Sequence, residues 1–345
     1  MSGFARRLQQ GAANTGFYAF APGAVKPIGA GDSGTRNVGP RIAEASLTIY
    51  NGDITLTPSS NISGLDIYGT VTGRGGTVTD CIIRGHDKPV SQDAMATGQS
   101  FDFGGATFEW CRFDGTGRES TWNDCIDGGN YTARYCEFTR GVDGIGADAV
   151  GNANIECCRI YNGYYTSWWD DTNGVVRTTS YTDFGGTTFN PPFLSQVSGD
   201  THSDGMQIQG QSGWIVRGCY IGGVRGSAAV NSQLDPTVAG DYATIQALNN
   251  GGDFVNTAII INAIAANPVG ALIELNWLEG GNARLNMSTA GTDLLQGVTV
   301  QNNRFIRSTW GGGGGFYIYA YANYQATLSN NVYDDDGTAV PIVTH

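Results

Sequence analysis

The chain has few charged residues and no long hydrophobic run. Charged residues make up 14% of the 345 positions, and the formal net charge is −12. Lysine occurs only at Lys26 and Lys88. An acidic surface repels phosphate backbones and anionic headgroups, and no segment approaches the ~20 apolar residues of a membrane-spanning helix. We therefore expect neither nucleic acid nor a membrane among the partners.

The chain also lacks the apolar core of a secretory signal. Arg6 and Arg7 stand near its start, but no continuous hydrophobic stretch follows them. Glycine and aromatic residues are abundant by contrast, with 52 Gly, 16 Tyr and 7 Trp. This composition is typical of a turn-rich β protein of an extracellular kind. Without an export signal it favours a virion surface component released by lysis; a mature exported enzyme is the alternative.

A short pattern centred on cysteine recurs along the chain. It reads TVTDCIIRG (77–85), TFEWCRFDG (107–115), TARYCEFTR (132–140), NIECCRIYN (154–162) and IVRGCYIGG (215–223). It continues with asparagine in LIELNWLEG (272–280), TVQNNRFIR (299–307) and TLSNNVYDD (327–335), and a degenerate copy, NISGLDIYG (61–69), comes first. A hydrophobic residue stands three positions before each central residue and another two positions after it.

The copies define three columns. The leading column is Ile62, Val78, Phe108, Ala133, Ile155, Val216, Ile273, Val300 and Leu328. The central column is Leu65, Cys81, Cys111, Cys136, Cys158, Cys219, Asn276, Asn303 and Asn331. The trailing column is Ile67, Ile83, Phe113, Phe138, Ile160, Ile221, Leu278, Phe305 and Tyr333.

The leading and trailing columns are an odd number of residues apart, so they cannot share one face of a straight strand. A bend between two inward-facing strands resolves this, and such a unit recurring every ~16–30 residues is one rung of a solenoid. Central side chains then stack ~4.8 Å apart, asparagines as a hydrogen-bonded ladder and cysteines as small buried residues. Disulfides or a metal site are the alternative for the cysteines, but no Cys-x-x-Cys pair occurs. We expect Cys125, outside the column, to be packed as well.

The nine copies resemble the right-handed parallel β-helix of the pectate-lyase type. The resemblance implies an all-β, single-stranded right-handed parallel β-helix of about nine rungs. Its parts are a capping or anchoring segment (1–45), the solenoid (46–335) with insertions near 161–203 and 222–257, and a C-terminal tail (336–345).

The first insertion is rich in aromatic residues, and a later loop places a tryptophan before five glycines. Aromatic faces stack on sugar rings, and carboxylates accept hydrogen bonds from sugar hydroxyls. These loops leave after the trailing column, so we expect them to gather on one side of the solenoid, where long loops bind ligands. Packing of the rings against the solenoid is the alternative. The candidate sugar-binding residues are Tyr164, Tyr165, Trp168, Trp169, Asp170 and Trp310.

Three aspartates occupy equivalent places in successive rungs. Asp143 and Asp204 each precede their central cysteine by fifteen residues, and Asp124 precedes its own by twelve in a shorter rung. Carboxylates stacked ~5 Å apart raise one another's pKa and divide into an acid and a base, as in glycoside hydrolases. His202 faces the same side of the strand as Asp204 and is placed to move a proton. We expect these four residues to be catalytic.

Two other interpretations of the aspartates stay open. Aspartate–glycine pairs often stabilise turns, and a column of carboxylates can bind a cation such as Ca²⁺. Otherwise we expect no cofactor and no metal.

The HSDG sequence (202–205), followed by an alternating strand, resembles phage tail-spike and polysaccharide-lyase-like β-helix proteins. The resemblance implies a polysaccharide ligand and a homotrimer. Lyases of this fold use basic groups, and only Arg134 and Arg217 stand near the aspartates as candidate binding residues, which puts lyase chemistry in doubt. We expect a virion spike or fibre that binds host polysaccharide, with cleavage an open question, and meets other virion proteins through residues 1–45. A free secreted hydrolase or lyase and a non-catalytic virion decoration protein are the alternatives.

Overall fold

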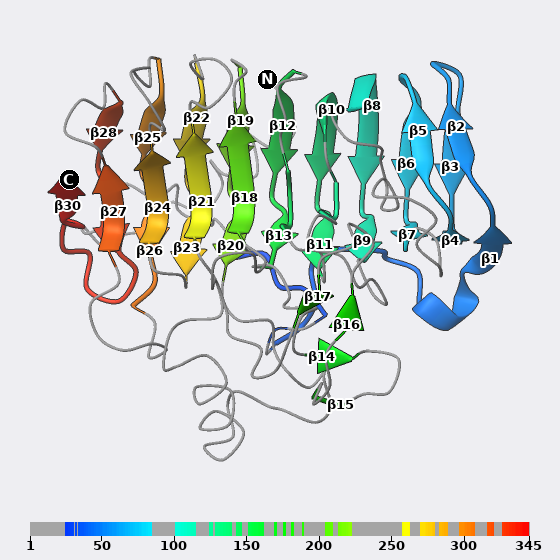
Figure 1. Cartoon of the computed structure of the whole chain (residues 1–345), viewed down its shortest axis with the longest axis horizontal. Helices are drawn as coiled ribbons and strands as arrows, with labels where there is room; N and C mark the ends of the chain where they lie inside the picture. Colours follow the sequence, from blue (N-terminus) through cyan, green and yellow to red (C-terminus); the bar gives the residue numbers. More distant parts are fainter. Residues whose placement is uncertain are drawn as a thin grey trace.

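The chain forms stacked parallel sheets whose strands follow one another in sequence order, as the computed structural model shows (Figure 1). Each rung contributes one strand to a ten-stranded sheet and one to a nine-stranded sheet, and the later rungs add a five-stranded sheet. The structure describes residues 25–30, 32, 34–84, 101–114, 124–126, 128–139, 143–146, 151–161, 169–170, 175–176, 181–182, 188–189, 204–209, 213–222, 257–262, 270–279, 283–288, 297–307, 316–320 and 326–344.

The two longest sheets run the length of the stack. The ten-stranded sheet contains β1 (Thr48–Asn51), β4 (Leu65–Tyr68), β7 (Ile82–Ile83), β9 (Arg112–Asp114), β11 (Glu137–Thr139), β13 (Arg159–Ile160), β20 (Tyr220–Gly222), β23 (Trp277–Glu279), β26 (Arg304–Phe305) and β29 (Val332–Tyr333). The nine-stranded sheet contains β3 (Asn61–Ser63), β6 (Thr77–Thr79), β8 (Phe101–Glu109), β10 (Gly128–Arg134), β12 (Ala153–Glu156), β19 (Ile215–Arg217), β22 (Leu272–Glu274), β25 (Thr299–Gln301) and β28 (Thr327–Ser329).

The remaining elements complete the stack or lie beside it. The five-stranded sheet contains β18 (Asp204–Gln209), β21 (Thr257–Asn262), β24 (Ala283–Ser288), β27 (Phe316–Ala320) and β30 (Ile342–Thr344). The two-stranded pairs are parallel β2 (Ile54–Leu56) with β5 (Val71–Gly73), antiparallel β14 (Trp169–Asp170) with β15 (Val175–Val176), and antiparallel β16 (Tyr181–Thr182) with β17 (Thr188–Phe189). One short 3-10 helix, η1 (Glu44–Ser46), occurs among the described residues.

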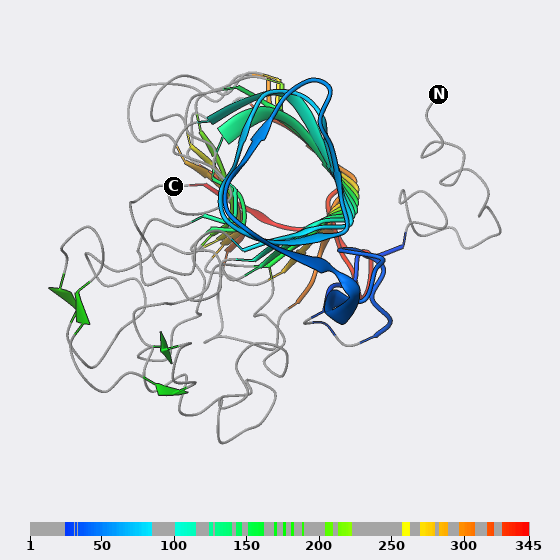
Figure 2. The ribbon, with the colours of Figure 1, turned by 90° about the vertical axis from the view of Figure 1, so that its right-hand side faces the viewer.

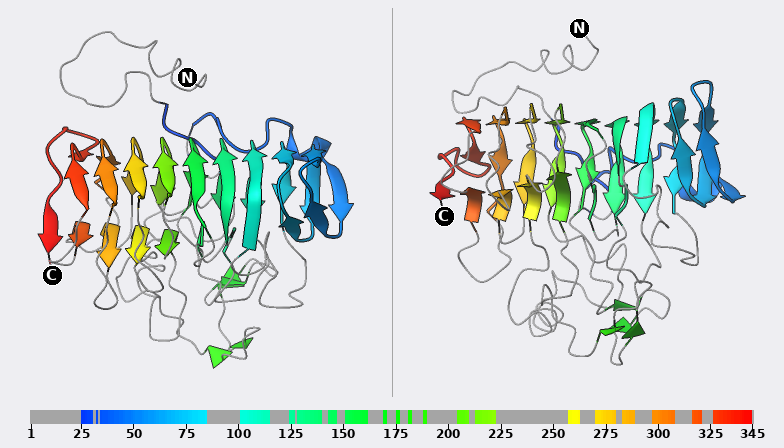
Figure 3. Two further views of the ribbon diagram at one scale, coloured as in Figure 1. Left: turned by 90° about the horizontal axis from the view of Figure 1, so that it is seen from above. Right: turned by 45° about the horizontal axis from the view of Figure 1, so that its top comes forward.

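The sheets face one another across a shared interior when the stack is viewed along its length (Figure 2). Figure 3 shows from two further directions that the chain advances along the stack from one end to the other. The architecture is therefore all-β with long parallel sheets, compatible with a parallel β-helix. Residues 342–344, expected in a C-terminal tail, instead extend the five-stranded sheet as β30. Within the described part of the chain, no helix is long and apolar enough to cross a bilayer.

The strand register confirms the leading and trailing columns predicted from the sequence. In the nine-stranded sheet Val78 pairs with Phe108, which pairs with Ala133, and the pairing continues to Leu328. In the ten-stranded sheet every residue of the trailing column pairs with the next, from Ile67 to Tyr333. Most of these side chains are buried, so the two columns build the core.

The predicted bend lies immediately before the central column. There the chain enters the left-handed region and turns from the nine-stranded sheet into the ten-stranded sheet. Gly, Asn and Asp adopt this conformation most readily, and five of the nine bends use them, whereas the other four use Trp, Tyr, Cys or Leu. The bend residues, all with φ between 53° and 69°, are Gly64, Asp80, Trp110, Tyr135, Cys157, Gly218, Leu275, Asn302 and Asn330.

The cysteines behave as the sequence predicted. All seven are free, and all except Cys157 are buried. Cys125, which stands outside the central column, is 0% exposed and is packed in the same core cluster. The thiols therefore act as small core side chains. The alternative interpretation of the cysteines as disulfide partners was wrong.

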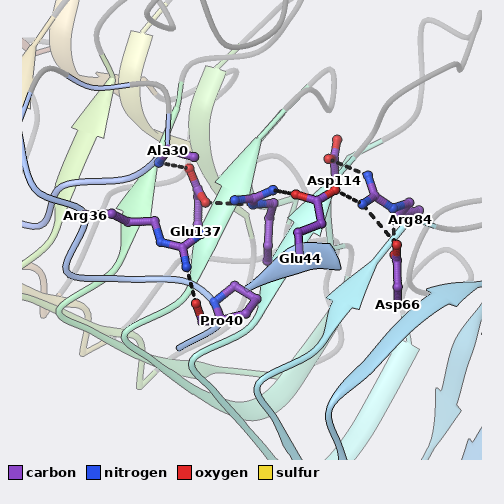
Figure 4. A network of polar contacts seen from close by, with 9 residues as sticks. Ala30, Arg36, Pro40, Glu44, Asp66, Arg84, Asp114 and Glu137 are labelled. Carbon is purple, nitrogen blue, oxygen red and sulfur yellow. Dashed lines mark hydrogen bonds and ion pairs between the residues drawn. The ribbon is translucent and has the colours of Figure 1, made fainter. Parts of the chain in front are cut away.

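Residues 25–47, which we call the strap, lie against the outer face of the ten-stranded sheet (Figure 1). Asp32 forms an ion pair with Arg159 of β13 at 2.8 Å. Glu44 forms ion pairs with Arg112 of β9, at 3.0 Å, and with Arg84 beside β7. Figure 4 shows the Glu44 contacts within a wider network that extends from Ala30 and Glu137 to Asp114 and Asp66. The strap therefore follows the stack in the direction opposite to the rungs.

Charge holds the strap in place. Burial raises the pKa of Asp32, but the Arg159 guanidinium outweighs this and leaves that pKa below its usual range. The same balance, with Arg84 and Arg112 as the cations, lowers the pKa of Glu44. Both carboxylates are therefore charged at neutral pH, and the strap is held against the outer face of the sheet beside β7, β9, β11 and β13.

Candidate functional site

The three aspartates do lie on successive strands. Ile145 forms a parallel bridge with Met206, so Asp143 and Asp204, each two residues earlier, are neighbours. The backbone amide of Cys125 donates to the carbonyl oxygen of Asp143 at 3.0 Å, which places Asp124 next in the row. The fifteen-residue spacing thus identified equivalent positions correctly.

The aspartate carboxylates already serve as hydrogen-bond acceptors between strands. Oδ1 of Asp124 accepts from the backbone amide of Asp143 at 3.1 Å, and Oδ1 of Asp143 accepts from that of Asp204 at 2.6 Å. Asp204 accepts from the Thr257 hydroxyl and, at 3.0 Å, from Nε2 of Gln207. The carboxylates of Asp124 and Asp143 therefore replace part of the backbone pairing between one rung and the next, whereas that of Asp204 bonds to side chains.

Burial separates these carboxylates from solvent to different degrees. Asp204 is 1% exposed and Asp143 is 5% exposed, whereas Asp124 is half-buried. A buried carboxylate is stable when it accepts several hydrogen bonds, and it must also reach the reacting atom if it is to act as an acid or base. The hydrogen bonds account for the burial of these carboxyl groups inside the fold; catalysis by these residues stays a prediction.

The glycines that follow Asp143 and Asp204 lie where two rungs approach closely. Asp204 begins strand β18, so the Asp204–Gly205 pair is extended rather than part of a turn. At Gly144 an added Cβ would lie 2.4 Å from Cγ2 of Ile160 and 2.6 Å from the carbonyl oxygen of Gly205. Only glycine fits this close approach between two rungs. In the described part of the chain, no group of three or more His, Cys, Asp or Glu side chains is arranged to hold a metal ion.

Arg134 and Arg217, expected to bind substrate, lie in a charge ladder on the outer face of the nine-stranded sheet. Arg134 pairs with Glu156 at 2.9 Å and with Glu109 at 3.4 Å. Arg217 pairs with Glu274 at 2.5 Å and contacts Glu156 at 4.0 Å. The structure places them at the C-terminal ends of β10 and β19. It does not bring them together with the aspartates in one sheet.

The other predicted site residues cannot be placed beside the aspartates. His202, Tyr164, Tyr165, Trp168 and Trp310 lie outside the described residues. The backbone of Trp169 and Asp170 forms β14, and their side chains are likewise outside the description. Their roles in binding or catalysis therefore stay predictions.

The structure reveals a groove that the sequence interpretation missed. It is a hollow of about 720 Å³ at the N-terminal ends of the strands of the nine-stranded sheet. We call it the corner groove. It crosses four successive rungs, those of β8, β10, β12 and β19, and so extends over three intervals of about 4.8 Å each. Its lining is Arg74, Asp102, Gly104, Gly105, Asn130, Tyr131, Thr132, Asn152, Ala153, Asn154, Gly213 and Ile215.

Glycines leave the groove open, and amide side chains line it. Gly105 and Gly213 have positive φ, and a Cβ added at Gly105 would meet nothing within 4 Å. Oδ1 of Asp102 accepts from Nδ2 of Asn130 at 2.9 Å and from the amide of Gly104 at 2.8 Å, and its carboxylate also pairs with Arg74. The glycines therefore leave room above a floor of polar groups held in place by hydrogen bonds.

A sequence signal for the groove was available. The position before each leading-column residue carries a polar side chain in successive rungs, at Thr77, Thr107, Thr132 and Asn154. The register confirms that these four residues form one outward-facing row. Because strand residues alternate in direction, the residue next to an inward column must point outward. Reading the outward row together with the inward ones would have drawn attention to this surface.

The comparisons with known proteins do not indicate a function, so the interpretation depends on the fold and the sites. No protein-family model matches the sequence, and no curated protein is significantly similar to it.

Proposed function

We propose that this chain is a surface spike or fibre protein of a phage-like virion, and that it binds host surface polysaccharide in the corner groove. In this proposal the fold is a single-stranded right-handed parallel β-helix of about nine rungs, of the pectate-lyase-like and tail-spike type. The chain assembles as a homotrimer, and its N-terminal segment meets other virion proteins. A sedimentation measurement of the purified chain tests the trimer directly.

The corner groove carries the proposal. It is lined by amides, a hydroxyl and an ion pair, with glycines that leave the floor open. Ligand sites use a few well-placed polar groups to orient what they bind, and hydroxyl-rich sugars match amide and hydroxyl side chains as both donors and acceptors. Its extension over four rungs suits a chain-like ligand.

In this proposal the buried aspartates stabilise the stack and do not perform chemistry. Asp143 and Asp204 are almost fully buried, and each accepts a hydrogen bond from the next rung. A groove that holds polysaccharide without an accessible carboxylate pair makes the protein an adhesin.

The binding test fills the groove. Thr132→Trp places a large side chain in the groove, and Thr299→Trp places the same side chain in the same outward row four rungs further along, outside the groove. On an array of bacterial capsular and cell-wall polysaccharides, we expect the wild type and Thr299→Trp to bind one class of glycan and Thr132→Trp to lose it. Equal binding by the two variants would place the ligand elsewhere.

Cleavage by the aspartate column is the second candidate function. Three carboxylates on consecutive strands support it, and the half-buried Asp124 is the most accessible of them. Incubation with the bound polysaccharide, following reducing ends and absorbance of unsaturated products, distinguishes the outcomes. Reducing ends alone indicate a hydrolase, both signals indicate a lyase, and neither indicates binding only. If cleavage occurs, Asp124→Asn should abolish it while the melting temperature changes little.

A further inference from the structure

We infer that the corner groove selects an uncharged glycan whose hydroxyl or acetamido groups donate hydrogen bonds, and that it discriminates against uronate-, sialate- or phosphate-bearing polymers. This inference rests on the proposed polysaccharide-binding function and specifies the ligand class. It is carried by three features of the groove and of the sheet face beside it.

The first feature is the absence of uncompensated positive charge in the described lining. Arg74 is the one basic residue among the twelve lining residues, and its guanidinium is paired with Asp102, the one acidic residue. Asp102 is in turn held by Asn130. An anionic sugar entering here would lose hydration without gaining a free cation, which is unfavourable.

The second feature is the charge ladder that runs beside the groove. Its guanidinium groups, on Arg134 and Arg217, each lie between carboxylates of neighbouring rungs. The ladder contains those two cations and three anions, Glu109, Glu156 and Glu274, so it presents no surplus positive charge to a ligand. The net charge of −12 adds a weak long-range repulsion of polyanions.

The third feature is an acceptor that lacks a donor. Oδ1 of Asn154 is buried and has no hydrogen-bond partner. Asn154 lines the groove, so a ligand donor that draws this oxygen out by rotation of the side-chain amide gains affinity, because an unpaired buried polar atom is unfavourable. Hydroxyl and acetamido N–H groups donate, whereas an ionised carboxylate only accepts. Thr132, paired in register with Asn154, provides a hydroxyl one rung away.

Spacing supports a polymer over a single sugar. Thr132 and Asn154, which both line the groove, follow one another in the outward row at the strand spacing of about 4.8 Å. A chain lying along the stack would therefore present equivalent hydroxyls to successive rungs.

The test measures binding of the full chain to neutral and anionic polymers by calorimetry at low and high ionic strength. The neutral probes are dextran, mannan and chitin oligosaccharides, and the anionic probes are polygalacturonate, alginate and polysialic acid, supplemented by a bacterial glycan array. We expect binding to a neutral glycan that changes little with salt. Asn154→Leu should weaken it about tenfold, the effect of a lost hydrogen bond in a buried site. Thr299→Leu, in the same outward row but outside the groove, should leave it unchanged.

Each alternative outcome separates the inference from the function on which it rests. Salt-sensitive binding of an anionic polymer that Asn154→Leu weakens would overturn the ligand class and leave polysaccharide binding in the groove standing. Binding of a neutral glycan that Asn154→Leu does not affect would overturn the proposed role of this groove. Binding to no polymer at all would overturn the proposed function and the inference together.

Discussion

The central column changes its chemistry part-way along the molecule. The rungs from Cys81 to Cys219 carry thiols, which we call the cysteine half, and the rungs from Asn276 to Asn331 carry amides, the asparagine half. These side chains are buried in both halves. Each follows a bend residue with positive φ, so the backbone is the same in both halves and only the side chain differs.

The amides of the asparagine half satisfy two backbone groups of the preceding rung. Nδ2 of Asn303 donates to the carbonyl oxygen of Ile273 at 2.9 Å, and its Oδ1 accepts from the amide of Asn276 at 3.0 Å. Nδ2 of Asn303 also lies 2.9 Å from Oδ1 of Asn331, which links the asparagines into a ladder. The predicted asparagine ladder is therefore confirmed.

In the cysteine half, Cys158 and Cys219 make the same two contacts at longer range. Sγ of Cys158 donates to the carbonyl oxygen of Ala133 at 3.6 Å and accepts from the amide of Cys136 at 3.4 Å. Sulfur is both a weak donor and a weak acceptor. The comparison teaches that, in the eight rungs after that of Leu65, the position after the bend carries a small side chain able to donate and accept, and that a thiol does so more weakly than an amide.

Raising the pH should produce the largest difference between the two halves in their contribution to the free energy of unfolding. The hydrogen bond with the Cys111 thiol, followed by burial, raises the pKa of the Cys81 thiol. Burial is the main cause that raises the pKa of the Cys111 and Cys158 thiols. Because the folded pKa exceeds the unfolded value of about 8.5, the protonated thiols stabilise the fold fully below that pH, and the contribution is lost as the pH rises. One unit above it, each of these thiols should cost about 1.4 kcal/mol, and because the asparagine half contains no cysteine the loss falls on the cysteine half alone.

Urea unfolding in reductant at several pH values from neutral upward measures this loss. The control is Cys158→Ala, whose deficit relative to the wild type should shrink as the pH rises, because the variant no longer has that thiol to ionise. A deficit independent of pH would show that the Cys158 thiol has an ordinary pKa.

Removing an amide should be the most damaging single substitution in the column. Asn303→Ala leaves the buried carbonyl of Ile273 and the amide of Asn276 without partners, and we expect a loss of about 3 kcal/mol in the free energy of unfolding. Equilibrium unfolding in urea measures it. The control, Ser329→Ala, alters an exposed side chain of the same half and should cost less than about 0.5 kcal/mol. A loss for Asn303→Ala no larger than that of the control would contradict the ladder's role.

Removing a thiol should cost less. Cys158→Ala gives up weak sulfur hydrogen bonds and leaves a small void, and we expect a loss of about 1.5 kcal/mol near neutral pH. The same urea experiment compares it with Asn303→Ala. Equal losses would mean that thiols and amides hold this bend equally well, and the difference between the halves would then be one of sequence only.

The smallest expected effects concern the bend residue itself. Cys157 has a φ of 54°, where glycine is less strained, so Cys157→Gly should raise stability by about 0.5–1 kcal/mol. Gly218, with a φ of 65° in the next rung, is the matched position, and Gly218→Ala should lower stability by about 1 kcal/mol. Thermal unfolding of both variants gives the two signs. A loss of stability for Cys157→Gly would show that packing of its side chain outweighs the backbone strain.

Much of the scaffold could be predicted because it repeats. Hydrophobic residues at constant distances from a central Cys or Asn indicated both inward columns and the bend between them, and strand register from Val78 to Leu328 confirms them. The aspartate row was predicted by the same counting. The chemistry of that row was not, because a carboxylate in a strand is equally compatible with catalysis and with a hydrogen bond to the next rung.

Sequence alone determined which residues face inward, since alternation along a strand and stacking of equivalent rungs follow from local geometry. Only the tertiary structure decided what lies outside them. Asp143 accepts its hydrogen bond from a residue 61 positions later, and the strap's Asp32 pairs with Arg159 from 127 positions away. The corner groove likewise exists because glycines of separate rungs align. These contacts depend on how far each insertion displaces one rung from the next along the chain, and no local pattern records that.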